Sequence, residues 1–170
     1  MKIIRTIAIL VIAFFAFQVN GQNLKIGHIN SSEILKLMPE VKTAQGDLEK
    51  FSKELQNQSD ILIAEYQKKT DEYQGLPANT SDVLKKDKET EIVQLEQRIK
   101  KFQEDAQGEV SKKQSELLEP IMKKLQDVIK EVAKEKGYDY ILDTSTGSVI
   151  FQNEAYDISS FVKKKLNILN

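Results

Sequence analysis

The most regular hydrophobic pattern in this chain lies between residues 40 and 136. In residues 40–74, apolar or small side chains recur at alternating steps of three and four positions, which is typical of the seam of a coiled coil. This stretch predicts one long helix of about 50 Å, at a rise of about 1.5 Å per residue. Its seam consists of Val41, Ala44, Leu48, Phe51, Leu55 and Leu62, with polar Gln58 in the slot before Leu62.

A second stretch with the same kind of periodicity spans residues 82–136. The segment before it, residues 75–80, contains glycine and proline and therefore predicts a turn. Thr80 or Ser81 can then cap a second helix, of about 80 Å. Its seam consists of Ile92, Leu95, Ile99, Phe102, Ala106, Val110, Leu117, Ile121, Leu125, Val128 and Val132. The two stretches together predict an antiparallel helical hairpin, a coiled-coil arm over residues 40–136.

The shorter elements on either side of the arm predict a small body made of residues 22–39 and 137–170. Asn30 and Glu33 form a capping-box pattern at the start of a short helix. Apolar runs bounded by turn residues predict three short strands, with a hairpin loop at 144–147. The predicted strands cover residues 24–30, 138–143 and 148–152, and a final amphipathic helix covers 157–166. The expected fold class is therefore mostly α with a small β body, into which the long arm is inserted.

The predicted body is too small to be stable as a single chain. A three-stranded sheet with free edges is marginally stable and prone to aggregation. Pairing the edges between chains removes this weakness, and closed cyclic symmetry is the usual form of such pairing. We therefore expect an obligate oligomer whose contacts lie in the body rather than in the arm.

The N-terminal segment has the layout of a secretory signal peptide. Two basic residues precede an apolar run over residues 7–17, which is too short for a comfortable membrane span. We expect cleavage near Gly21, with Gln22 as the alternative last residue, so that residues 1–21 form the signal peptide. An uncleaved anchor helix is the alternative. Because the chain has no cysteine, it suits the oxidising periplasm of a Gram-negative cell.

Composition excludes most catalytic and cofactor chemistry. With no cysteine and one histidine, the chain has no thiolate nucleophile, thiolate metal site or histidine pair. It has no glycine-rich phosphate loop, and a formal net charge of −1 gives no case for nucleic-acid binding. His28 is expected to be packed or at a rim, and Asp139 and Asp143 are not accompanied by further metal ligands. We predict no cofactor, no metal, no nucleic-acid partner and no enzymatic activity.

Several apolar side chains near the predicted turn lie outside the helical seam. They are Ile61, Ile63, Tyr66, Tyr73, Leu76 and Val83. These residues either pack inside the arm or form a dispersed, weakly apolar surface that holds apolar clients. The second alternative makes them the candidate binding site.

The two ends of the mature chain resemble the Skp family of periplasmic chaperones, also called the OmpH family. The resemblance is carried by Lys25–Asn30, Glu33–Leu35, Pro39, Leu118–Ile121, Val132–Asp143 and Asp157–Ser159. It implies a homotrimer in which three strands per chain form an intersubunit β-barrel, with helical arms around a cavity. It also implies ATP-independent holding of unfolded outer-membrane proteins before membrane insertion, with no catalytic residue.

The charge of the chain departs from the basic character that is common in this family. Loss of residues 1–21 removes two of the 25 basic residues and none of the 26 acidic ones, so the net charge changes from −1 to −3. Steering of clients by net charge is therefore not expected, although local lysine pairs remain and transient contact with a membrane surface is a further expectation. The alternative function is a structural coiled-coil scaffold or spacer of the cell envelope. The turn at residues 75–80 weighs against a spacer, because a continuous rod would reach further.

Overall fold

The computed structural model of the chain describes residues 24–168. The predicted signal peptide, residues 1–21, lies outside the described residues. The elements are β1 (Ile26–Ile29), α2 (Ser31–Leu37), α3 (Pro39–Gln74), α4 (Asp82–Lys136), β2 (Tyr140–Asp143), the short 3-10 helices η1 (Thr144–Thr146) and η2 (Glu154–Tyr156), and α5 (Ser159–Lys165). The predicted fold class is confirmed in its main feature, because the chain is mostly helical with a small strand region.

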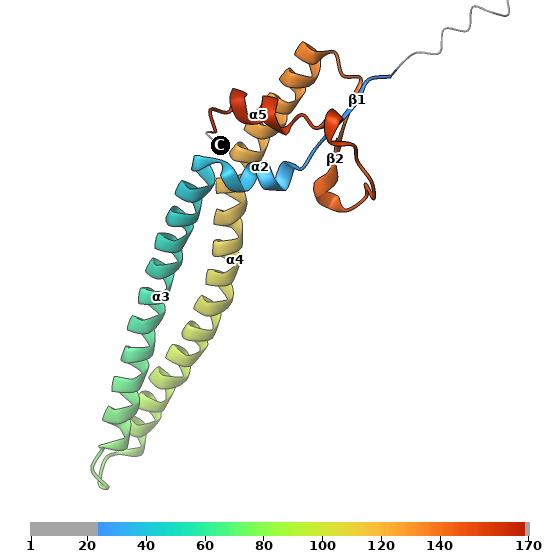
Figure 1. Cartoon of the computed structure of the whole chain (residues 1–170). Helices are drawn as coiled ribbons and strands as arrows, with labels where there is room; N and C mark the ends of the chain where they lie inside the picture. Colours follow the sequence, from blue (N-terminus) through green and yellow to red (C-terminus); the bar gives the residue numbers. More distant parts are fainter. Residues whose placement is uncertain (1–23, 169–170) are drawn as a thin grey trace, which may run out of the picture.

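The two long helices lie side by side and form an arm that extends from the body (Figure 1). Near the turn, Lys69 Nζ lies 2.7 Å from a carboxylate oxygen of Glu91. At the other end, Lys124 forms an ion pair with Glu40. Because the start of one helix pairs with the end of the other at both places, α3 and α4 run in opposite directions.

Local side-chain and backbone chemistry sets the ends of the arm helices. Pro39 occupies the first turn of α3, where its missing N–H costs nothing. Ser81 caps α4 by accepting a hydrogen bond from the backbone N–H of Leu84 at 3.4 Å. Gly137 ends α4 with φ at +69°, and the following N–H, of Tyr138, donates to the carbonyl of Ala133. The predicted range of α4 is confirmed.

The predicted seam is buried or half-buried along both helices, with one correction. The slot between Leu55 and Leu62 was expected to hold Gln58, but Gln58 is exposed and Ser59 is only 8% exposed. A straight helix has about 3.6 residues per turn, so steps of four and then three keep the buried stripe on the same face as steps of three and then four. The arm therefore has a polar hydroxyl in its seam at Ser59.

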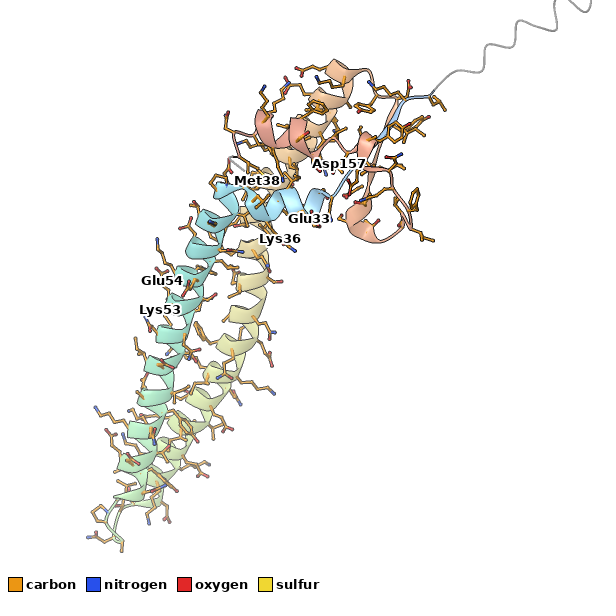
Figure 2. The ribbon with its side chains drawn as sticks, in the orientation of Figure 1. Glu33, Lys36, Met38, Lys53, Glu54 and Asp157 are labelled. Carbon is orange, nitrogen blue, oxygen red and sulfur yellow. The ribbon has the colours of Figure 1, made fainter. Side chains whose placement is uncertain are left out.

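The body is built around a two-stranded parallel sheet. Strands β1 and β2 pair from Ile26 opposite Tyr140 to Ile29 opposite Asp143. Helix α5 lies beside the last turns of α4, α2 leads from β1 toward the arm, and Met38 lies at the corner between α2 and α3 (Figures 1 and 2). The most deeply buried side chains are Ile29, Ile34, Met38, Val132, Ile158 and Val162. This core joins the first and last segments of the chain to the base of the arm.

The predicted third strand is wrong for the single chain. Residues 148–152 are irregular, and the expected hairpin loop is replaced by η1 followed by Gly147 with φ at +73°. The free edge of β1 is instead used by residues after this segment: Asp157 bridges to His28, and the N–H of Ile158 donates to the carbonyl of His28 at 3.0 Å. Residues 148–152 do not pair with β2 either, so the sheet in the described residues has two strands, β1 and β2.

Three other predicted boundaries were too long. β1 is shorter than residues 24–30, β2 is shorter than 138–143, and α5 is shorter than 157–166. At the start of α5, Asp157 belongs to the bridge with β1, and its carboxylate accepts from the N–H of Ser159 at 2.7 Å. The residue thus ends an extended segment and holds the helix start, so it is not itself helical.

Candidate functional site

The six apolar residues predicted near the turn do not form one surface. Ile61 is 68% exposed and Val83 is 81% exposed, and Ile63 is also exposed. The remaining three, Tyr66, Tyr73 and Leu76, are half-buried. The two predicted alternatives, internal packing and free surface, therefore each describe part of the set.

Helical geometry explains this division. Successive residues on a helix are rotated by about 100°, so Ile61 and Ile63 lie on opposite flanks of the buried Leu62. Tyr66 and Tyr73 follow Leu62 by four and eleven positions and so continue the seam. As contacts for a binding partner, the six residues stay a prediction, and they would have to act as separate contact points.

The arm near the turn is also held by ion pairs. Lys69 and Lys88 both approach the carboxylate of Glu91, and Lys88 lies 3.9 Å from a carboxylate oxygen of Glu72. The hydrogen bond from Lys69 lowers the pKa of Glu91, and the same bond raises the pKa of Lys69. These charges keep the outer surface hydrated around the exposed apolar side chains.

The body exposes a second set of apolar side chains, which sequence reasoning did not single out. Ile150 is 99% exposed and Phe151 is 87% exposed. Beside them, a groove of about 460 Å³ lies over one face of the sheet. Its lining includes Leu24, Ile26, Leu142, Val149, Phe151 and Tyr156. The signal in the sequence is the uninterrupted apolar run at residues 149–151, which predicts a strand rather than an exposed surface.

His28 is a structural residue at the bottom of this groove. Its side chain is 6% exposed, and its Nε2 lies 2.9 Å from the carbonyl oxygen of Asn153. Nε2 is therefore the hydrogen-bond donor, and the ring fastens the segment before η2 to β1. The prediction that His28 is packed is confirmed by this position.

Asp139, just before β2, and Asp143, at the end of β2, also have structural partners. Asp139 accepts from the backbone N–H of Lys25 at 2.7 Å. Asp143 accepts from the hydroxyl of Ser31 and from the N–H of Ser145. Burial raises the pKa of Asp143, but the hydrogen bonds from Ser31 and Ser145 outweigh it, so the net pKa is lowered. Among residues 24–168, no group of three possible metal-ligating side chains comes together.

The exposed apolar side chains are spread over the arm and the body and are not gathered in one pocket. Contiguous apolar groups exposed beside polar ones typically mark interaction surfaces. In the part of the chain that the structure covers, no helix is both long enough and apolar enough to cross a membrane. A family model described as "Outer membrane protein (OmpH-like)" matches residues 25–166. The chain therefore belongs to the OmpH family.

Relatives with assigned names agree with this membership. The chain is 27% identical to the chaperone protein Skp of Pectobacterium atrosepticum over 146 residues, which cover 84% of this chain and 85% of the relative. It is also 27% identical to the Skp chaperone of Yersinia enterocolitica over 149 residues, covering 85% and 87% of the two chains. The chain is thus an OmpH-like chaperone and not an enzyme.

A solved structure has the same fold. A crystal structure from Caulobacter crescentus, described as an outer membrane chaperone (OmpH-like), superposes with a TM-score of 0.73. The match covers 85% of this chain and 84% of the other, at 14% sequence identity. At this identity the likeness concerns the fold, including the arm and the small body.

Proposed function

We propose that this chain is an ATP-independent periplasmic holdase that binds unfolded outer-membrane β-barrel proteins and prevents their aggregation before membrane insertion. The observation that supports it most strongly is the family match over residues 25–166, together with Skp-named relatives that align along most of their length. In this proposal the chain works as a homotrimer. The bodies form an intersubunit β-barrel, and the coiled-coil arms enclose the client cavity.

The surface of the body supports the oligomeric part of the proposal. Ile150 and Phe151 project from the chain almost fully exposed, next to the groove over the sheet. A two-stranded sheet is marginal alone, and exposed apolar patches of this kind are typical of interfaces. In a trimer these side chains would lie against the neighbouring subunit, and closure into a barrel would remove the free sheet edges.

The arm supports the holding part of the proposal. Its apolar side chains are scattered among charges, so each contact with a client is weak and many contacts act together. The scattered residues Ile61, Ile63 and Val83 are exposed enough to make such contacts. Weak and dispersed contacts suit a protein that must release its client without hydrolysing a nucleotide.

The proposed location is the periplasm, after cleavage near Gly21. The amino-acid pattern of residues 1–21 supports export, and the absence of cysteine suits that compartment. The net charge of −3 after cleavage gives no general attraction to anionic lipids. Transient membrane contact would rest on local lysine pairs such as Lys85 and Lys86.

Native mass spectrometry of the purified protein, alone and with an unfolded outer-membrane β-barrel protein, tests the proposal. A trimer that adds one client and keeps it soluble without ATP is the expected result. A trimer that ignores the client would favour an envelope scaffold instead. A monomer or a dimer would contradict the shared barrel.

A further inference from the structure

One side of the arm carries a long groove between α3 and α4. A hollow of about 440 Å³ lies between α3 and α4 in the middle of the arm. It is lined by Leu55, Gln56, Ser59, Phe102, Gln103, Ala106, Gln107, Val110, Ser111 and Gln114. A second hollow, of about 190 Å³, shares Gln114 with the first and continues toward the body. It is lined by Leu35, Lys36, Val41, Ala44, Gln45, Leu48, Gln114, Leu117 and Leu118.

The composition of this groove differs from that of the arm around it. The arm, residues 40–136, contains 18 basic and 21 acidic residues. None of the ten residues that line the first hollow is charged, and only Lys36 is charged in the second. Figure 2 shows charged side chains such as Lys53 projecting from the outer surface of α3. Apart from Lys36, the groove is thus a strip without charged lining residues on a highly charged arm.

The strip lies on one side of the arm because its residues occupy equivalent positions next to the seam in both helices. The apolar floor is formed by Leu55, Phe102, Ala106 and Val110, which are all half-buried. The residues immediately after them in sequence are Gln56, Gln103, Gln107 and Ser111. The residues immediately before them are Glu54, Lys101, Asp105 and Glu109.

In each helix, the residue after a seam residue is rotated by about 100° to one side of the seam. Because α3 and α4 face each other and run in opposite directions, this rotation places the residues that follow the seam on the same side of the arm in both helices. The preceding positions then lie together on the opposite side. An ion pair between Lys101 and Asp105, at 2.9 Å, lies on that charged side. The arm therefore has one charged side and one amide-rich side.

The chemistry of the amide-rich side suits a polypeptide backbone. Each glutamine amide offers both a hydrogen-bond donor and an acceptor, as a backbone needs for its carbonyl and N–H groups. Gln56 gives one amide hydrogen to Asp60 at 2.8 Å and keeps its carbonyl oxygen as an acceptor. The apolar floor can take uncharged side chains, and the lack of formal charge does not select for or against client charge.

We propose that this groove binds an extended segment of an unfolded client polypeptide, through glutamine amides at its rim and apolar side chains on its floor. The inference rests on the proposed holdase function and names the place where the client lies. From Gln45 to Ser59 the groove runs along α3 for about 21 Å. An extended chain rises about 3.3 Å per residue, so the groove accommodates about six client residues.

The test adds negative charge to the groove without changing side-chain size. The variant Gln103→Glu/Gln107→Glu replaces two exposed amides by carboxylates that cannot donate to a client carbonyl. The matched control is Gln58→Glu/Gln94→Glu, which makes the same change at exposed positions that precede the seam residues Ser59 and Leu95. Both variants keep a good helix former at each position. Thermal melts followed by circular dichroism check that both are folded.

The probe is an N-acetylated, C-amidated, uncharged apolar peptide of about eight residues, measured by fluorescence anisotropy beside an unfolded outer-membrane protein. Loss of two hydrogen bonds predicts that the groove variant binds the probe about tenfold more weakly. The control is expected to stay within about twofold of the wild type. Equal binding by both variants overturns the proposal.

Two further outcomes are distinguishable. If the wild type binds neither probe nor unfolded protein, the holdase function fails, and the groove proposal fails with it. If the groove variant binds clients normally but changes the oligomeric mass in native mass spectrometry, the groove is covered by a second copy of the chain, which also overturns the proposal.

Discussion

Gly27 is the residue at which the body has the least room for a side chain. A Cβ added there would lie 3.0 Å from Cδ1 of Ile141 and Cε1 of Tyr138, and 3.1 Å from Cγ2 of the fully buried Ile158. Because these neighbours come from two other segments of the body, Gly27→Ala is expected to lower the free energy of unfolding by about 1–3 kcal/mol. Chemical denaturation measures the change.

The control for this prediction is another glycine with open space around it. Gly108 lies exposed inside α4, and nothing lies within 4 Å of a Cβ added there. Gly108→Ala should stabilise the protein by about 0.5–1 kcal/mol, because alanine loses less backbone entropy in a helix. Equal effects of the two substitutions would contradict the tight packing at Gly27.

Asp143 is expected to make stability depend on acid pH. Its folded pKa is below the ordinary value of 3.8, because the hydrogen bonds from Ser31 and Ser145 outweigh the opposing effect of burial. A lowered folded pKa means that the contribution is present above about pH 4 and is lost as the pH falls through the folded value. The contribution is at most about 1 kcal/mol, since water screens this largely exposed carboxylate.

Asp143→Asn should therefore be less stable than the wild type near neutral pH, and the difference should vanish in strong acid. Urea unfolding between about pH 2.5 and 7 measures it. Ser31→Ala should reduce the same pH dependence, because it removes one of the donors. A difference that stays constant over the whole range would show that the charge of Asp143 is not responsible.

At the level of the elements, we expect a substitution in the arm to unfold the arm and a substitution in the body to unfold the body. Leu95 is buried in the seam between the long helices. Leu95→Asp places a charge in this seam and should destabilise the arm by about 3 kcal/mol or more. Hydrogen exchange should then lose protection along α3 and α4 near residue 95, while amides in the body core stay protected.

Two comparison variants test the separation. Val93→Asp changes an exposed residue two positions away and should alter stability by about 0.5 kcal/mol or less. Ile141→Asp lies in β2 against the body core and should disturb the body and its assembly first. Identical exchange patterns for Leu95→Asp and Ile141→Asp would argue against independent parts.

For the whole molecule, the proposed trimer depends on side chains that the single chain leaves uncovered. Ile150→Asp/Phe151→Asp should shift the native mass from trimer to smaller species. Burial of two such side chains contributes about 3 kcal/mol per subunit or more, which corresponds to at least about a hundredfold in association. Val83→Asp, at an equally exposed position on the arm, should leave the trimer intact. A double variant that remains trimeric would remove residues 150 and 151 from the interface.

The long helices could be predicted closely from the amino-acid pattern because their determinants are local. Helical hydrogen bonds join residues four positions apart, and the seam periodicity shows which stripe is buried. Capping by Ser81 and the left-handed conformation of Gly137 set the ends of α4 where the sequence places them. The one error in the seam, Gln58 for Ser59, is a shift of a single position within the same stripe.

The candidate sites were less accessible to sequence reasoning. Six apolar residues that are close in sequence do not form one cluster, because the rotation of the helix places Ile61 and Ile63 on opposite flanks of Leu62. The amide groove lies across two helices whose lining residues are about 50 positions apart, so its pattern emerges only once α3 and α4 are aligned. Its signal in sequence is weak, since a glutamine is an ordinary residue on any helix surface.

By itself, then, the sequence determined the helical elements, the break between them, the lack of catalytic residue types and the resemblance to a chaperone family. The tertiary structure alone decided which segments meet in the sheet. Strand pairing satisfies backbone groups with partners that are distant along the chain, as for β1 and β2, which are separated by the whole arm. The tertiary structure also decided that residues 148–152 do not pair with β2 and that Phe151 is exposed, because a short apolar run is compatible with a strand but does not by itself specify a pairing partner.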